Sequence, residues 1–224
     1  MMKAILLDFD GTILDTESPQ YESWKAVYAD FAVDLPVELY ARCIGSSHER
    51  FDPVQHLESE TGKPIDWDAI HPRRRAHYRD LLEREEILPG ITELLEQAGE
   101  RGLKLAIASS SPRDWVLPLL EKHGLVDSFD AIVTLDDVSQ PKPDPELFLL
   151  ALERLAVERK EAIVIEDSPN GCEAAARAGI FCVFVPNLLT ARLEVRHRHW
   201  RLDSLAQTTV VELEKRLGGN EDVG

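Results

Sequence analysis

Two aspartates directly follow the first apolar stretch of the chain. Residues 3–7 read Lys-Ala-Ile-Leu-Leu, and Asp8 and Asp10 come next. Side chains alternate in an extended chain, so both carboxylates should project the same way from the end of a buried strand, where an open α/β sheet binds its ligands. Like charges this close repel each other unless a cation lies between them. The pair therefore indicates a hard divalent ion such as Mg²⁺, bound through oxygens, and chemistry on an anionic substrate.

An Asp-Phe-Asp-Gly sequence also occurs in two unrelated structural contexts. A pair of aspartates that caps a helix or forms a turn is common in any chain, and the local sequence alone leaves that alternative open. An EF-hand loop does not fit. Counting from Asp8, Ile13 stands where a glycine is required and Pro19 where the final glutamate is required.

Further polar candidates stand at other strand ends or before a helix. Ser109 follows the second expected strand, Lys142 precedes a helix, and Glu166 and Asp167 follow the fourth strand. Taken singly, such residues usually cap helices or face solvent. Together they supply the groups that metal-assisted attack on a phosphate requires: a nucleophile, a proton donor, metal ligands and donors to the phosphoryl oxygens.

Alternating strands and helices would position these residues. Beyond strand 3–7, the apolar pattern predicts strands at 103–108, 131–133, 162–165 and 181–185, and helices at about 91–101, 112–123, 145–155 and 168–178. Strict alternation of this kind predicts an α/β protein with a doubly wound parallel sheet. The carboxyl ends of the strands would then gather the polar residues at one edge.

Between the first two strands the sequence is helical throughout. Helix-like runs occupy roughly 17–32, 36–44, 49–60 and 66–86, punctuated by prolines and glycine. We expect an inserted all-helical cap domain at 16–88, hinged near Asp15-Thr16 and Leu88-Pro89-Gly90, and a catalytic core made of 1–15 and 89–217. Residues 218–224 are expected to form a frayed tail. A cap of this kind can close over a site and exclude water.

Composition limits the partners. The chain has 25 Lys and Arg against 41 Asp and Glu, a net charge of −16, which argues against nucleic acid or an anionic membrane as a partner. The first apolar run is too short for a signal peptide and no later one approaches a membrane span, so we expect a cytoplasmic protein, with a monomer favoured. Cys43, Cys172 and Cys182 are scattered and should pack as small apolar residues.

Four short motifs carry a family resemblance. In chain order they are Asp8-Phe9-Asp10-Gly11-Thr12, Ala108-Ser109, Lys142-Pro143 and Glu166-Asp167-Ser168. They resemble the four motifs of the haloacid dehalogenase superfamily of aspartyl phosphotransferases, and the resemblance covers residues 1–187. The helical insert resembles the cap of the β-phosphoglucomutase-like and phosphoglycolate-phosphatase-like branch, and residues 201–205 resemble its last strand and turn. The resemblance implies a Rossmann-like core with a cap, and Mg²⁺ as cofactor.

The resemblance also implies roles for the core residues. Asp8 would attack phosphorus and carry an aspartyl-phosphate, while Asp10 would protonate the leaving oxygen and later activate water. Metal ligation would fall to Asp8, Asp167 and the backbone carbonyl of Asp10, with Glu166 beside them as a further candidate. The phosphoryl oxygens would be held by Ser109 and Lys142. Dehalogenases lack the second aspartate, so Asp10 favours a small phosphorylated metabolite over a haloacid as substrate.

Substrate choice is expected to come from the cap. Mutases of this branch carry a histidine and an arginine there, and the matching positions hold Gln20 and, near the Gly45 loop, His48. This departure favours hydrolysis by a phosphatase, with a sugar-phosphate mutase as the alternative enzyme and a phospho-acceptor signalling module as the alternative of another class. Candidate substrate contacts are Thr16, Gln20, Gly45, His48, Arg50 and Ser110. The basic clusters at 73–79 and 196–201 are expected to be solvated faces, with no role assigned.

Overall fold

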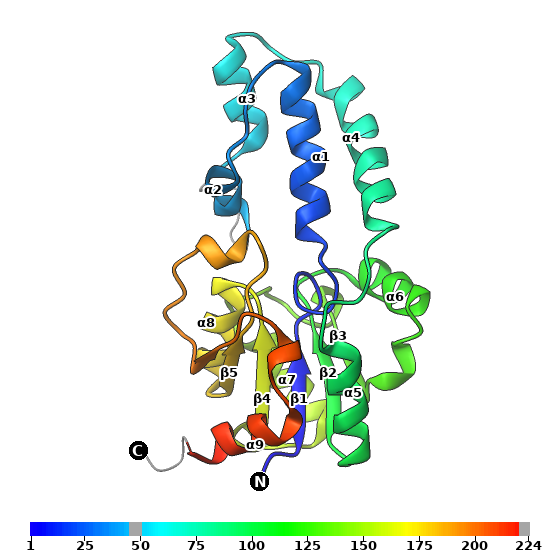
Figure 1. Cartoon of the computed structure of the whole chain (residues 1–224), viewed down its shortest axis with the longest axis vertical. Helices are drawn as coiled ribbons and strands as arrows, with labels where there is room; N and C mark the ends of the chain where they lie inside the picture. Colours follow the sequence, from blue (N-terminus) through cyan, green and yellow to red (C-terminus); the bar gives the residue numbers. More distant parts are fainter. Residues whose placement is uncertain (45–50, 220–224) are drawn as a thin grey trace.

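One parallel sheet forms the centre of the molecule (Figure 1). The computed structural model describes residues 1–44 and 51–219. The six strands run in the order β3-β2-β1-β4-β5-β6, and all of their pairings are parallel. The strands are β1 (Ala4–Leu7), β2 (Lys104–Ala108), β3 (Ala131–Val133), β4 (Ala162–Glu166), β5 (Phe181–Phe184) and β6 (Trp200–Arg201).

The first strand occupies the middle of the sheet. Leu7 of β1 lies opposite Ile107 of β2 on one side and Ile165 of β4 on the other. The chain adds β2 and β3 on one side of β1 and then returns to add β4, β5 and β6 on the other side. Where the order reverses, a crevice opens beyond the carboxyl ends of the strands. The residues that directly follow β1 and β4 therefore meet there.

Helices cover both faces of this sheet, as expected for a doubly wound fold. Ile5 and Leu7 point to one face and pack in a cluster with residues of α5 (Ile91–Glu100), α6 (Arg113–Lys122) and α9 (Val210–Gly219). Ala4 and Leu6 point to the other face, against α7 (Glu146–Leu155) and α8 (Pro169–Ala178). Burial on both faces explains why β1 is a continuous apolar run.

The segment between β1 and β2 is helical, as the sequence predicts. It contains α1 (Glu17–Asp30), α2 (Val37–Tyr40), α3 (Pro53–Thr61) and α4 (Trp67–Leu82), which rise beyond the strand ends (Figure 1). Asp52 and Asp66 cap α3 and α4 by accepting from backbone N–H groups of the first turn. These helices bury their own cluster of aromatic and aliphatic side chains, which Leu189 joins from the loop after β5.

Two linkers join the helical insert to the core. Leu14 forms an antiparallel bridge with Ile87, and the backbone N–H of Leu88 donates to the carbonyl of Ile13 at 2.9 Å. The chain thus enters and leaves the insert at neighbouring points. This pairing lies next to both expected hinges, but the limits 16 and 88 stay a prediction.

Several element boundaries differ from the predictions. The helix expected to reach residue 86 ends at Leu82, and a turn at residues 83–84 follows it. The helix expected from residue 49 begins at Pro53, where Asp52 caps it. The expected tail begins inside α9, a helix without a counterpart among the predicted elements: Leu213 and Leu217 of this helix are buried against the sheet, and Gly218 and Gly219 are still helical.

All three cysteines pack against apolar clusters, as expected. Cys172 and Cys182 are fully buried, with their sulfurs 3.5 Å apart, whereas Cys43 is half-buried. Across residues 1–44 and 51–219, none of the helices combines the length and the apolar character needed to cross a membrane.

Candidate active site

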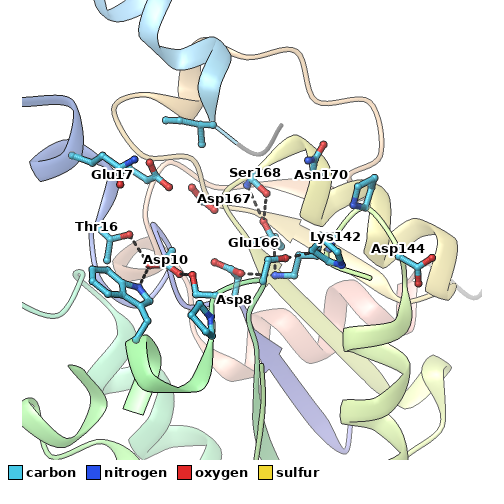
Figure 2. A pocket seen from close by; sticks show the side chains of 18 of the residues that line it. Asp8, Asp10, Thr16, Glu17, Lys142, Asp144, Glu166, Asp167, Ser168 and Asn170 are labelled. Atoms are coloured by element: carbon cyan, nitrogen blue, oxygen red, sulfur yellow. Dashed lines mark hydrogen bonds and ion pairs between the residues drawn. The ribbon is translucent and has the colours of Figure 1, made fainter. Parts of the chain in front are cut away.

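A cavity of about 1100 Å³ lies beyond the carboxyl ends of the strands. The core lines it with Asp8, Asp10, Lys142, Glu166 and Asp167 among others, and the insert contributes residues of its own (Figure 2). The predicted residues Thr16, Gln20 and Ser110 also line it. The sequence motifs are thus brought together, although they are spread over most of the chain.

Lys142 lies between two buried carboxylates. Its ammonium donates to Asp8 Oδ1 and, at 2.7 Å, to Glu166 Oε1, and the three side chains are 5%, 10% and 1% exposed, respectively. Burial alone would lower the pKa of Lys142, but the two carboxylates outweigh it and raise that pKa, so the lysine stays charged. A fixed positive charge therefore lies against the proposed nucleophile.

Burial raises the pKa of Asp8. The charge of Lys142 opposes this rise, and the nearby carboxylates Glu166 and Asp10 add to it. The ion pair with Lys142 therefore does not offset the combined effect of burial and of the two neighbouring carboxylates. A second cation would favour the ionised form, which is the form that can attack phosphorus.

Both carboxylate oxygens of Glu166 already have protein donors. Oε1 accepts from Lys142, and Oε2 accepts from the backbone N–H and the hydroxyl of Ser168 at 2.8 and 2.9 Å. A Cβ on Gly171, in the first turn of α8, would lie 1.7 Å from Glu166 Oε1, so only glycine fits beside this carboxylate. This geometry favours Glu166 as the residue that holds Lys142 rather than as a metal ligand.

Asp167 is held from the opposite side. Its side chain is buried, and Oδ2 accepts from Asn187 Nδ2 at 2.8 Å. Gly11, with φ of +80°, packs so closely that a Cβ there would lie 2.4 Å from the same oxygen. Burial, followed by the charges of Glu166 and Asp8, raises the pKa of Asp167 well above its usual value. Two buried carboxylates that repel each other across one cavity form a site for a cation.

The donor set fits Mg²⁺. The cavity is lined by Asp8, Asp10, Glu17, Asp144, Glu166 and Asp167 against the cations Lys142 and Arg177. Within residues 1–44 and 51–219, no three His, Cys, Asp or Glu side chains converge as a ready-made metal cage. Mg²⁺ suits such a site because it binds through one or two carboxylates and keeps several waters. Asp8, Asp167 and the carbonyl of Asp10 are the oxygens that would hold it.

Three donors hold the carboxylate of Asp10. Thr16 Oγ1 and Trp115 Nε1 donate to Oδ1 at 2.9 and 2.8 Å, and Ser111 Oγ donates to Oδ2 at 2.6 Å. The contact with Thr16 is visible in Figure 2. Thr16 belongs to the candidates from the sequence, whereas Ser111 and Trp115 do not. Both follow the Ser109 motif closely, but nothing in their spacing marks them as partners of Asp10.

Ser109 does not line the cavity. Its side chain is 1% exposed, and its Oγ accepts from the backbone N–H of Ser111 at 3.0 Å. The neighbouring Ser110 does line the cavity, and its hydroxyl accepts from the backbone N–H of Lys142 at 3.2 Å. The role of Ser109 on the phosphoryl oxygens stays a prediction.

The insert contributes Gln20, Ile44 and Tyr78 to the cavity wall, together with Glu17 at the start of α1. Glu17 is not among the candidates from the sequence. Its burial, with the charges of Asp10 and Asp15 nearby, raises its pKa to about 8, so a protonated carboxyl faces the cavity at neutral pH. The other substrate candidates, Gly45, His48 and Arg50, lie outside the described residues.

None of the arginines in the two basic clusters lines the cavity. Arg73 pairs with Asp30, and Arg74 donates to Ser23 Oγ at 3.1 Å while its guanidinium lies over the ring of Trp24, so both link α4 to α1. In the second cluster, Arg196 pairs with Glu194 at 3.0 Å, and His199 Nδ1 accepts from the backbone N–H of Cys182 at 3.0 Å. These contacts are structural.

Comparison with known proteins extends this picture. The family model of haloacid dehalogenase-like hydrolases matches residues 5–185. YhcW of Bacillus subtilis (strain 168) is 40% identical over 207 residues, which make up 92% of this chain and 94% of that protein. A phosphorylated carbohydrates phosphatase of Thermotoga maritima is 34% identical over 181 residues, 80% of this chain and 82% of the relative. A CbbY variant from Rhodobacter sphaeroides, solved in complex with xylulose 1,5-bisphosphate, aligns with a TM-score of 0.73 and 28% identity over 95% of this chain and 99% of its own.

Proposed function

The chain belongs to the haloacid dehalogenase-like hydrolase family, and we propose that it is a phosphatase that hydrolyses phosphate esters of small sugars through Asp8. The ion pair between Lys142 and Asp8 is the observation that supports this proposal most directly. It places a buried nucleophile beside a fixed cation, at the crevice of the sheet, with the second acid Asp10 at the same cavity. Asp8 attack on phosphorus forms the new P–O bond as the bond to the sugar oxygen breaks, and Asp10 gives that oxygen its proton.

The second half of the reaction uses the same residues. Asp10, now ionised, takes a proton from a water molecule, whose oxygen attacks the phosphorus of the aspartyl-phosphate. The bond to Asp8 breaks, inorganic phosphate leaves, and both carboxyl groups return to their first state. Lys142 offsets the charge that develops next to Asp8 in each step. Mg²⁺, when bound by Asp8, Asp167 and the carbonyl of Asp10, would supply further positive charge for the phosphoryl oxygens.

The shape and lining of the cavity support a sugar phosphate. Its volume of about 1100 Å³ exceeds what a phosphate group needs, and the insert adds the polar side chains of Glu17 and Gln20. One relative is named a phosphorylated carbohydrates phosphatase, and another protein of similar structure is solved with a sugar bisphosphate. We therefore take residues 16–88 as a cap that selects the sugar.

A release assay tests this function directly. Phosphorylated sugars and other small monophosphates are incubated with the protein, with Mg²⁺ or with chelator, and inorganic phosphate is measured. We expect turnover only with Mg²⁺ and fastest with sugar phosphates. Failure to turn over any ester, with stable labelling of the protein instead, would favour the signalling module.

The fate of the phosphorylated protein separates hydrolysis from a mutase reaction. The protein is phosphorylated with acetyl phosphate and Mg²⁺, and phosphate release is followed with and without glucose 1-phosphate or glucose 6-phosphate. With Gln20 rather than an imidazole at the cavity, we expect rapid release in both cases. Slow release together with interconversion of the two sugars would contradict hydrolysis and identify a mutase.

A further inference from the structure

The hydrogen bond between Trp115 and Asp10 gives the acid of the site a defined proton position. Trp115 is in the first turn of α6, and its Nε1 donates to Asp10 Oδ1 at 2.8 Å. An indole N–H can only donate, whereas the hydroxyls of Thr16 and Ser111 can donate or accept. When Asp10 is protonated, a proton on Oδ1 would point against the indole N–H. The proton is therefore held on Oδ2, where the hydroxyl of Ser111 can turn and accept it.

The indole ring of Trp115 also contacts the helical insert. The ring stacks on Tyr78 of α4, with centroids 5.9 Å apart and planes inclined by 15°. Both aromatic side chains line the cavity. A stacked ring has a fixed plane, so the direction in which Nε1 points depends on where α4 places Tyr78.

We propose that Trp115 is a positioning residue for Asp10, which selects the oxygen that carries the transferable proton, and that Tyr78 makes this selection depend on the placement of the insert. The proposal rests on the proposed function, because it requires Asp10 to act as the acid. It concerns the transfer of a proton to the leaving group. It therefore predicts a loss that depends on how much the leaving group needs that proton.

Two aryl phosphates of similar shape provide the test. Phenyl phosphate releases a basic phenolate that needs protonation, whereas p-nitrophenyl phosphate releases a stable phenolate that does not. The value of kcat/KM is measured for both, with saturating Mg²⁺, because it reports the first phosphoryl transfer. Trp115→Phe keeps the stack on Tyr78 and removes the N–H. Because Asp10 becomes charged as it gives up its proton, the indole N–H donates to a charged oxygen in the transition state, and we expect its removal to lower kcat/KM about 10- to 100-fold with phenyl phosphate. With p-nitrophenyl phosphate we expect a fall of less than about threefold.

Three further variants keep the outcome interpretable. Trp67→Phe is the matched control, because its Nε1 donates to Glu58 at 2.9 Å within the insert, away from the cavity, and it should leave both substrates unchanged. Tyr78→Leu keeps the N–H but frees the indole, and should reproduce the selective loss on phenyl phosphate. Asp10→Asn is the reference for complete loss of the acid.

The outcomes separate the two proposals. Suppose that Asp10→Asn shows the selective loss on phenyl phosphate. If Trp115→Phe then loses activity equally on both substrates, or loses none, the role of Trp115 is overturned and the proposed phosphatase function stands. A Tyr78→Leu variant that behaves as wild type would overturn the dependence on the insert. If Asp10→Asn itself shows no selective loss, Asp10 is not the acid, and both the role of Trp115 and the proposed acid–base mechanism fail.

Discussion

Asn187 donates a hydrogen bond to Asp167, from Nδ2 to Oδ2, at 2.8 Å. Its own Oδ1 accepts from the backbone N–H groups of Leu189 and Thr190, both at 2.9 Å. The loop after β5 therefore fixes the orientation of a proposed metal ligand, and the same loop inserts Leu189 into the cluster of the helical insert. Hydrogen-bond partners of this kind orient ligands and raise metal affinity.

Asn187→Ala should weaken metal binding. Loss of the partner of a ligating carboxylate typically costs about 10- to 100-fold in affinity, because the carboxylate is no longer held in the ligating orientation. Calorimetric titration of the metal-free protein with Mn²⁺ or Mg²⁺ measures this. Melting of wild type and variant in chelator serves as the control for folding. Equal affinities in two folded proteins would show that Asp167 does not ligate the metal.

Asp8→Asn and Asp10→Asn should both leave the fold intact but differ in severity. The first replaces the nucleophile by a nearly isosteric amide and should abolish turnover. The second removes general acid–base catalysis and should cost on the order of 10²–10⁴ in rate. Initial rates of phosphate release measure both, and transfer of phosphate from acetyl phosphate to the protein should be lost in Asp8→Asn alone. Near wild-type turnover by Asp8→Asn would exclude covalent catalysis through this residue.

Glu17 should make stability depend on pH. Because its pKa is raised from 4.5 to about 8 in the folded protein, the folded state keeps a proton that the unfolded chain releases at lower pH. The resulting stabilisation is complete below pH 4.5 and is lost as the pH rises through 8. The free energy of unfolding of the wild type should therefore fall between these pH values. In the presence of chelator, this fall should be smaller in Glu17→Gln by about 1–2 kcal/mol; the difference is modest because the half-buried side chain keeps some hydration.

Denaturant unfolding at several pH values from 4.5 to 8.5 provides the measurement for Glu17. Glu22→Gln is the matched control, because Glu22 lies on the same helix but is exposed. Parallel curves for wild type and Glu17→Gln would mean that the Glu17 carboxyl ionises as freely as it does in water.

Gly171→Ala should destabilise the protein, whereas Gly99→Ala should not. Both glycines lie in helices, but a Cβ at residue 171 would lie 1.7 Å from Glu166 Oε1, and one at residue 99 meets nothing within 4 Å. We expect a loss of about 1–3 kcal/mol at residue 171 from overpacking. A gain of about 0.5–1 kcal/mol is expected at residue 99 from helix propensity. Chemical denaturation checks both, and the loss at residue 171 should be accompanied by lower activity, because Glu166 holds Lys142.

The sequence predicts the core of this protein well because its signals are local. The buried run of β1 and the strand-end carboxylates Asp8 and Asp10 can be read from a few neighbouring residues, and so can the alternation of strands and helices. The residues that orient the carboxylates of the cavity cannot be read from neighbouring residues. Trp115, Tyr78 and Asn187 act through contacts between distant segments, and nothing periodic in the sequence marks such contacts.

The boundaries that differ from the predictions have similar causes. No glycine or proline stands directly after Leu82, so the sequence does not mark the end of α4 there, and its helical pattern continues past the last helical turn. Val210, Leu213 and Leu217 of α9 have helical spacing, but this helix has only ten residues, and its apolar residues are recognisable as core only once they pack against the sheet. The raised pKa of Glu17 likewise arises first from its burial in the folded protein, and then from the charges of Asp10 and Asp15.

The bridge between Leu14 and Ile87 holds the two ends of the helical insert together, so the insert can be exchanged as one unit. Its two ends leave the core from one point, so an ancestor could have exchanged residues 15–86 for another lineage's segment in a single recombination without disturbing a strand of the sheet. If the insert selects the sugar as proposed above, such an exchange would alter which sugar is recognised and leave the proposed nucleophile Asp8 unchanged. Leu189 of the core packs in the cluster of the insert, so an engineered chimaera would have to preserve this contact between the two parts.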